Sequence, residues 1–229
     1  MIKPDRFFNA SLVFINEDTM VLSGESLDYN RKKALRFSLG TKEQNLKRIQ
    51  DEIICSKIEG VLNVDFIGFF STYDPQELFF EEDYEALRTN CKLNNHPLSR
   101  FRWKMQNTKN TLVTCFDLVD GDLGCFSREE RELLRPQLRV LLEKVCIEDF
   151  YAQNQCYLLH EDIQARNILF QRKVGGGYKL WLSDFGKVRY VRNQHLVMAC
   201  IDKGLERIVN SKSFGCSVEC LGKRKRRRV

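Results

Sequence analysis

The segment covering residues 157–186 constrains the fold of this chain most strongly. Two short apolar strands, 168–170 and 180–182, lie in it on either side of three consecutive glycines at 175–177. Glycines between two apolar strands are typical of a β-hairpin. Polar residues come directly before the first strand and directly after the second. The pattern therefore predicts a hairpin with polar residues before its first strand and after its second.

These polar residues have a fixed order. Asp162 follows His160 after one residue, Asn167 follows Asp162 by five residues, and the second strand ends in Asp184, Phe185 and Gly186. This set resembles the catalytic loop and the metal-binding loop of the eukaryotic protein-kinase superfamily. The resemblance implies an α+β, two-lobed, protein-kinase-like fold with a β-rich N-lobe and a shortened helical C-lobe. It also implies ATP and Mg²⁺ as cofactors.

The resemblance gives each of these residues an expected role. Phosphoryl transfer needs a carboxylate near the attacking hydroxyl and oxygen ligands for magnesium. We expect Asp162 to be the first, and Asn167 and Asp184 to be the metal ligands. Phe185 would then anchor the segment, and Gly186 would let the backbone turn sharply.

The N-terminal region reads as β structure. Residues 12–22 predict a hairpin with its turn at 16–19, and a third strand is expected at 33–37. In the family this third strand ends in a lysine that binds phosphate. Arg36 stands at that position, and a planar guanidinium holds phosphate differently from a compact ammonium. The family's glycine-rich loop is also absent from the hairpin.

A helix is expected after these strands. Thr41 and Gln44 form a capping box at its start, and Gly60 closes the segment. It occupies the place of the kinase helix whose glutamate pairs with the strand cation. If the kinase pattern is aligned without gaps from this helix into the following strand, 63–70, the position of the glutamate falls on Asp51. A shift of one residue places it on Glu52, whose side chain is longer. We expect Glu52, and a solvated acidic helix face remains the alternative.

Residues 111–123 resemble the strand and hinge that join the two kinase lobes. The resemblance implies that the backbone from Phe116 to Leu118 binds adenine, with Thr114 or Cys115 behind the pocket. The expected domains are an N-lobe-like region at 1–118 with an insertion at about 71–110, a C-lobe at 119–214 and a disordered basic tail at 215–229. The insertion is expected to contain a helical segment, 76–87, and a strand, 100–106.

The C-lobe is expected to contain three helices. A capping box at Ser127 opens one that stops before Pro136, and Pro136 begins a second. The third covers 202–209, where the resemblance implies that Asp202 braces the catalytic loop. Glu161 replaces the arginine that receives the activation-loop phosphate in many kinases, which argues against that mode of regulation.

Composition adds information on location and partners. Of 37 Lys and Arg, six are consecutive at 223–228, so the other 31 equal the 31 Asp and Glu. Such a basic run is read by nuclear import receptors. A neutral body gives no support for nucleic-acid binding. No apolar run is long enough for a membrane span, so we expect an intracellular protein of the nucleus or cytoplasm.

The nine cysteines are scattered and are expected to be reduced thiols. Cys216 and Cys220 are the only close pair in the sequence, and for these two a zinc site is the alternative to free thiols.

Two functions remain open from the sequence. The first is an ATP- and Mg²⁺-dependent phosphotransferase acting on Ser or Thr of a protein substrate. The second is a pseudokinase that serves as an interaction or regulatory module. Retention of Asp162, Asn167 and Asp184 favours the enzyme. Arg36, the missing glycine-rich loop and the short C-lobe favour the pseudokinase.

Overall fold

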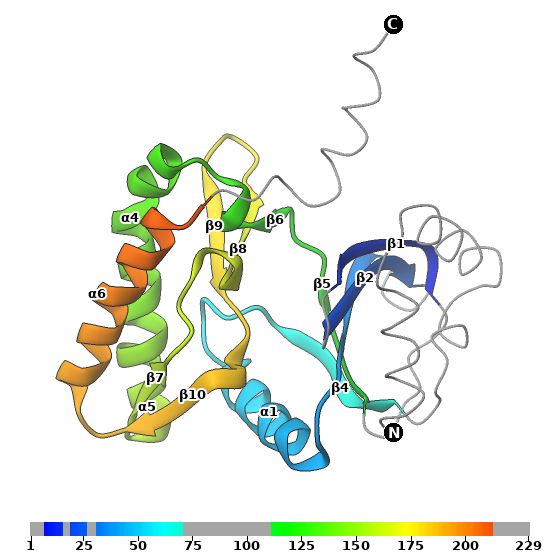
Figure 1. Cartoon of the computed structure of the whole chain (residues 1–229), viewed down its shortest axis with the longest axis horizontal. Helices are drawn as coiled ribbons and strands as arrows, with labels where there is room; N and C mark the ends of the chain where they lie inside the picture. Colours follow the sequence, from blue (N-terminus) through cyan, green and yellow to red (C-terminus); the bar gives the residue numbers. More distant parts are fainter. Residues whose placement is uncertain (1–6, 16–18, 27–30, 71–110, 213–229) are drawn as a thin grey trace, which may run out of the picture. The chain divides into compact units, whose positions relative to one another are not determined.

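The computed structural model describes residues 7–15, 19–26, 31–70 and 111–212 of the chain, and its architecture is mixed α+β (Figure 1). The chain divides into two units. The N-terminal unit combines residues 1–49 with 63–118, and the C-terminal unit combines 50–62 with 119–229. Of the predicted turn at 16–19, residues 16–18 lie outside the described residues, as do the insertion at 71–110 and the tail at 215–229 with Cys216 and Cys220.

The N-terminal unit is built on an antiparallel sheet of five strands in the order β1-β2-β3-β5-β4. The predicted hairpin and third strand are confirmed, because β2 pairs with both neighbours, for example Met20 with Phe37. Met20, Leu35 and Phe37 are buried, and so is Ala34 on the other face of β3, so this strand is buried on both faces. The strands are β1 (Phe7–Ile15), β2 (Thr19–Ser26), β3 (Arg31–Ser38), β4 (Val64–Phe70) and β5 (Thr111–Asp117).

Helix α1 (Lys42–Cys55) follows β3 and begins at the predicted capping box. The Gln44 N–H donates to the Thr41 hydroxyl at 3.2 Å, and the Thr41 N–H donates to the Gln44 side chain at 3.0 Å. The segment after the helix ends at Gly60, whose φ of +91° favours glycine. A Cβ there would lie 2.8 Å from Leu141 Cδ1. Glycine is therefore required at this position both by the backbone conformation and by the packing.

Residues 50–62 form part of the C-terminal unit. The Leu182 N–H donates to the carbonyl of Gly60 at 2.9 Å, and Val61 forms a parallel bridge with Leu182. Cys55, Ile58 and Val61 belong to the same apolar core as the helices of that unit. A segment from the N-terminal half of the sequence thus completes the C-terminal unit.

Helix α4 (Arg128–Glu143) runs without interruption through Pro136, so the predicted break before this proline is wrong. The Ser127 and Glu130 capping box at its start is confirmed. Proline in a helix interior removes one backbone hydrogen bond and strains the preceding turn. Here the buried residues on both sides of it, Arg131 and Leu138, follow one stripe at helical spacing. Packing of this stripe as a single surface outweighs the local cost of the proline.

The rest of the C-terminal unit places short strands beside the helices. Strand β7 pairs with β10, and β8 pairs with β6 and β9, which confirms the predicted hairpin through pairs such as Ile168 with Leu182. The elements are β6 (Gly121–Asp122), a π-helical turn (Lys144–Asp149), α5 (Phe150–Asn154), β7 (Tyr157–His160), β8 (Ile168–Arg172), β9 (Tyr178–Leu182), β10 (Val188–Val191) and α6 (Gln194–Asn210).

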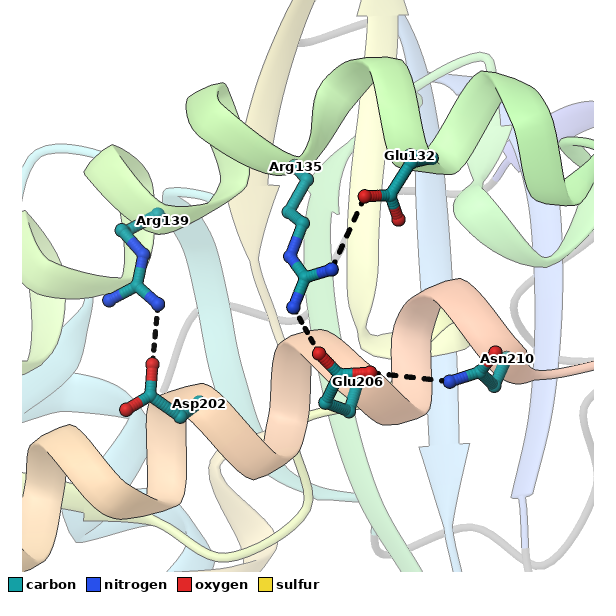
Figure 2. Close-up of polar contacts among 6 residues, drawn as sticks. All are labelled: Glu132, Arg135, Arg139, Asp202, Glu206 and Asn210. Carbon is teal, nitrogen blue, oxygen red and sulfur yellow. Dashed lines mark hydrogen bonds and ion pairs between the residues drawn. The ribbon is translucent and has the colours of Figure 1, made fainter.

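Helices α4 and α6 lie side by side and exchange ion pairs along their outer edges (Figure 2). Arg135 pairs with Glu206, and Arg139 pairs with Asp202 at 2.5 Å. The Asp202 carboxylate is half exposed and contacts α4, so the expectation that it braces the loop containing Asp162 is wrong. Exposed ion pairs of this kind stabilise a protein little.

The predicted helix at 202–209 is confirmed within α6, and a glycine brings it close to the Asp162 loop. A Cβ built on Gly204 would lie 2.4 Å from Ile163 Cγ2, closer than packed side chains come. The loop is therefore supported by direct backbone-to-side-chain packing and not by an aspartate. Within the described part of the chain, no helix combines the length and apolar content needed to cross a membrane.

Candidate functional site

The loop from His160 to Asn167 connects β7 to β8 and ends in a 3₁₀ turn, Ala165–Asn167. The Asn167 side-chain amide donates to the backbone carbonyl of Asp162 at 2.8 Å. This bond closes the loop on itself across five residues. It also leaves the side-chain oxygen of Asn167 as the remaining polar atom of a buried side chain.

The second predicted segment starts at Ser183, directly after β9. Asp184 has φ 61° and ψ 71°, the left-handed conformation that costs an L-residue about 1–2 kcal/mol. A short 3₁₀ turn, Phe185–Lys187, follows. The left-handed residue at this turn is therefore Asp184, and Gly186 lies within the 3₁₀ turn that follows. Strain of this kind recurs at functional sites, where the surroundings over-determine the backbone.

Hydrogen bonds join the two segments. The Ser183 N–H and hydroxyl both donate to the carbonyl of Asn167, at 2.9 and 3.0 Å. The His160 ring lies 3.3 Å through Nε2 from the carbonyl of Ser183. The buried Phe185 ring stacks edge-on against His160, with centroids 5.5 Å apart. Residues 162, 167 and 184, which the sequence predicted as one site, are thus held on two segments bonded to each other.

The bonds of His160 define its protonation. The Ser183 carbonyl can only accept, so Nε2 carries the proton, and the Asp162 N–H donates to Nδ1 at 3.3 Å. Burial lowers the pKa of His160, although the Ser183 carbonyl and the charges of Asp184 and Asp162 act in the other direction. The neutral imidazole with a proton on Nε2 is therefore the form that connects the two segments.

Stability should depend on pH through His160. Its folded pKa lies below the unfolded value of about 6.5, so above that pH both states are neutral and the group has no effect. Below it the unfolded chain binds a proton that the folded chain does not, and stability falls by up to about 1.4 kcal/mol per pH unit until the folded pKa is reached. Urea unfolding followed across this range should show the loss in wild type and not in His160→Gln.

The exposed His195 provides the matched control for this experiment. His195→Gln should keep the pH dependence of the wild type. An unchanged slope in His160→Gln would contradict the assignment.

Two cations that were not predicted from the sequence lie beside the loop. The Lys187 ammonium lies 3.5 Å from Asp162 Oδ2, and Arg189 pairs with Glu161. The backbone of Lys187 is fixed as well, since its carbonyl accepts the Glu161 N–H at 2.9 Å. Both contacts arise from the β7–β10 pairing. The only available signal was the presence of basic residues shortly after Gly186.

The N-terminal unit contains two candidate cations on β3. Arg36 contacts the hydroxyl of Thr114 on β5 at 3.5 Å. Lys33, which the sequence analysis did not consider, is buried between Asp65 and Asp117, each 2.7 Å away. Burial alone would lower the pKa of Lys33, but the hydrogen bonds and charges of Asp117 and Asp65 outweigh it and raise the pKa. Lys33 therefore has a structural role in the sheet, and Arg36 remains the candidate for phosphate.

The predicted adenine-binding backbone lies at the end of β5. Phe116 pairs in register with Ala34, and the Leu118 N–H donates to the carbonyl of Lys32 at 3.2 Å. Because this donor is already used, an adenine ring at this edge would have to bind the Leu118 carbonyl or displace the Lys32 bond. Cys115 and Thr114, expected behind the pocket, are both buried.

The two acidic candidates on α1 are both buried, which excludes a solvated acidic face for them. Asp51 accepts a hydrogen bond from the Tyr190 hydroxyl at 2.6 Å. Burial and this carboxylate raise the pKa of Tyr190 well above its usual range, so the hydroxyl stays protonated and donates. Asp51 therefore has a partner on β10, and the pairing expected for Glu52 stays a prediction.

The side chains present fit a magnesium ion that is shared with phosphates. Among the described residues, no group of three or more His, Cys, Asp or Glu forms a complete metal site. Magnesium in phosphoryl-transfer sites is held by one or two protein oxygens together with phosphate and water. Asp184 offers a carboxylate and Asn167 an amide oxygen, which is sufficient for that kind of coordination.

No protein-family model matches this chain, and no curated protein matches its sequence.

Proposed function

We propose that the chain is an ATP- and Mg²⁺-dependent phosphotransferase of the protein-kinase type that acts on Ser or Thr of a protein. The observation that carries the proposal is the bonding between the two site segments, in which Ser183 binds Asn167 and His160. A loop with a carboxylate and a second loop with a metal-ligating carboxylate must be held in register for in-line phosphoryl transfer. The sheet order β1-β2-β3-β5-β4, with Arg36 on β3, supports a nucleotide-binding N-lobe.

In this proposal each residue has one task. Asp162 accepts a hydrogen bond from the substrate hydroxyl and orients it. Asp184 and Asn167 hold the magnesium, which neutralises the phosphates when bound. His160 stays neutral and keeps the two segments at a fixed distance. Arg36 would bind the phosphates with Glu52 as its expected partner, and the backbone of Phe116 and Leu118 would bind the adenine.

Asp184→Asn should remove most of the stabilisation by Mg-ATP. Asparagine keeps the shape of the side chain and tolerates the left-handed backbone at this position, so that the charge alone is lost. Ligand at one hundred times its Kd stabilises a fold by about 2.7 kcal/mol. We expect a thermal shift with Mg-ATP in wild type, and little shift in Asp184→Asn or with ATP and EDTA.

Asp202→Asn is the control, because Asp202 faces α4 and not the site. It should keep the full shift. A shift of equal size in wild type and Asp184→Asn would mean that Asp184 does not hold the metal.

A pseudokinase is the second candidate, and two contacts favour it. The Leu118 N–H is bound to the Lys32 carbonyl, and the Lys187 ammonium lies against Asp162. A module that only binds partners would keep both contacts. If Mg-ATP caused no thermal shift in the wild type under any condition, the pseudokinase would be favoured. For either function we propose that the basic run at 223–228 is read by nuclear import receptors.

A further inference from the structure

Two cations lie directly beside the carboxylates of the Asp162 loop. The β7–β10 pairing places Arg189 opposite Leu159 and brings the backbone of Lys187 within hydrogen-bond distance of Glu161. Both side chains are mostly exposed while they pair, Lys187 with Asp162 and Arg189 with Glu161. The loop is therefore bordered by positive charge on its β10 side.

Helix α6 adds two more cations at the same loop. Cys200, Lys203 and Arg207 share one helical face, and the Cys200 thiol donates to the carbonyl of His160 at 3.3 Å. Gly204, on the next position of this face, packs against Ile163. The face that carries Lys203 and Arg207 thus borders the loop, and both side chains are exposed.

The charges at this border do not cancel. Within the described part of the chain, no carboxylate forms an ion pair with Lys203 or Arg207, whereas Lys187 and Arg189 each have one. Burial raises the pKa of Cys200, the charge of Glu161 acts in the same direction, and the charges of Arg207, Lys203 and Arg189 oppose it. We call Lys187, Arg189, Lys203 and Arg207 the cationic surface. Its net charge stays positive after Glu161 and Asp162 are counted.

We propose that the cationic surface binds an acidic peptide segment and so directs phosphoryl transfer to hydroxyls that lie among Asp and Glu residues. Lys187 of this surface contacts Asp162, so acidic residues that flank a hydroxyl bound at this carboxylate would lie close to the surface. Its acidic side chains would pair with Lys203 and Arg207 and compete for Lys187, which releases Asp162 toward the hydroxyl. This inference rests on the proposed phosphotransferase function for its catalytic part, and the binding part stands alone.

Exposed ion pairs are individually weak and are screened by salt. The preference of the protein for acidic over neutral peptides should therefore be modest and should depend on ionic strength. Two or three such contacts give about a tenfold effect, mainly on KM. The probes are two synthetic peptides with one serine flanked on both sides by aspartates or by asparagines. With the full chain and Mg-ATP we expect about tenfold lower KM for the aspartate peptide at low salt, and loss of the preference at high salt.

Variants show whether the preference depends on the cationic surface or on the total charge of the protein. Lys203→Glu combined with Arg207→Glu should abolish the preference for aspartates. Lys173→Glu, an equal change in the exposed turn between β8 and β9, should keep it. Circular dichroism of each variant shows whether its fold is retained.

Fluorescence anisotropy of the labelled peptides distinguishes failure of this inference from failure of the proposed function. Preferred binding of the aspartate peptide without phosphate transfer would support the binding role of the cationic surface and contradict the phosphotransferase function. Transfer to both peptides with equal KM and equal binding would contradict the binding role and support the phosphotransferase function. Tighter binding of an oligouridylate than of the aspartate peptide would also overturn it, in favour of a nucleic-acid partner.

Discussion

Asp162→Asn should lower phosphoryl transfer by about 10²- to 10⁴-fold, the contribution typical of a positioned proton acceptor. Asparagine keeps the size of the side chain, and the backbone bonds to His160 and Asn167 do not involve the carboxylate. The loop should therefore keep its conformation while it loses the group that orients the hydroxyl. ATP affinity should stay close to that of wild type, because in the proposed function Asp162 binds the acceptor hydroxyl and not the nucleotide.

The measurement is autophosphorylation and ATP affinity on the same preparations. Asp202→Asn, which removes an equal charge outside the loop, is the control and should retain transfer. If Asp162 only braced its loop, stability and ATP binding would fall together. Transfer that is unchanged in Asp162→Asn would rule out the catalytic role, and no transfer by wild type would favour the pseudokinase.

Arg131→Met should destabilise the C-terminal unit by about 2–3 kcal/mol, the cost of losing hydrogen bonds from a charged donor and leaving their acceptors unsatisfied. Arg131 is fully buried and donates to the Ser211 hydroxyl at 2.8 Å and to the Ser211 carbonyl at 2.5 Å. Ser211 caps the C-terminus of α6, where a cation is favourable for the helix dipole. Methionine fills a similar volume but leaves a carbonyl and a hydroxyl without this donor.

Urea unfolding followed by circular dichroism tests this. Arg128→Met, on the exposed side of the same helix, should change stability by less than about 0.5 kcal/mol. Ser211→Ala should cost about 1 kcal/mol, since only one of the bonds is lost. Equal midpoints for Arg131→Met and Arg128→Met would show that the buried contact adds nothing.

Local signals in the sequence were read correctly where their cause is local. Both capping boxes, at Thr41 and Ser127, use a side chain and a backbone group three residues apart, so the sequence contains the whole interaction. The break predicted at Pro136 failed for the opposite reason. The continuity of α4 depends on how its buried stripe packs against the rest of the unit, and a local rule for proline does not contain that information.

The site shows the same division. The order of Asp162, Asn167 and Asp184 was visible, because apolar strands and turn glycines mark the loops that hold them. The hydrogen bonds from Ser183 to Asn167 and from His160 to Ser183 are accepted by backbone carbonyls. Because every residue has a carbonyl, the residue types in the sequence do not predict these bonds. The contact of Lys187 with Asp162 likewise depends on the pairing of β7 with β10.

The membership of residues 50–62 in the C-terminal unit has a consequence for the synthesis of the protein. The ribosome releases this segment well before Leu182, the strand residue whose N–H binds the carbonyl of Gly60. Until then Ile58 and Val61 lack the core in which they are finally buried. The C-terminal unit therefore does not fold as a separate continuous piece while the chain emerges, and a fragment that starts at Val119 lacks part of its own core.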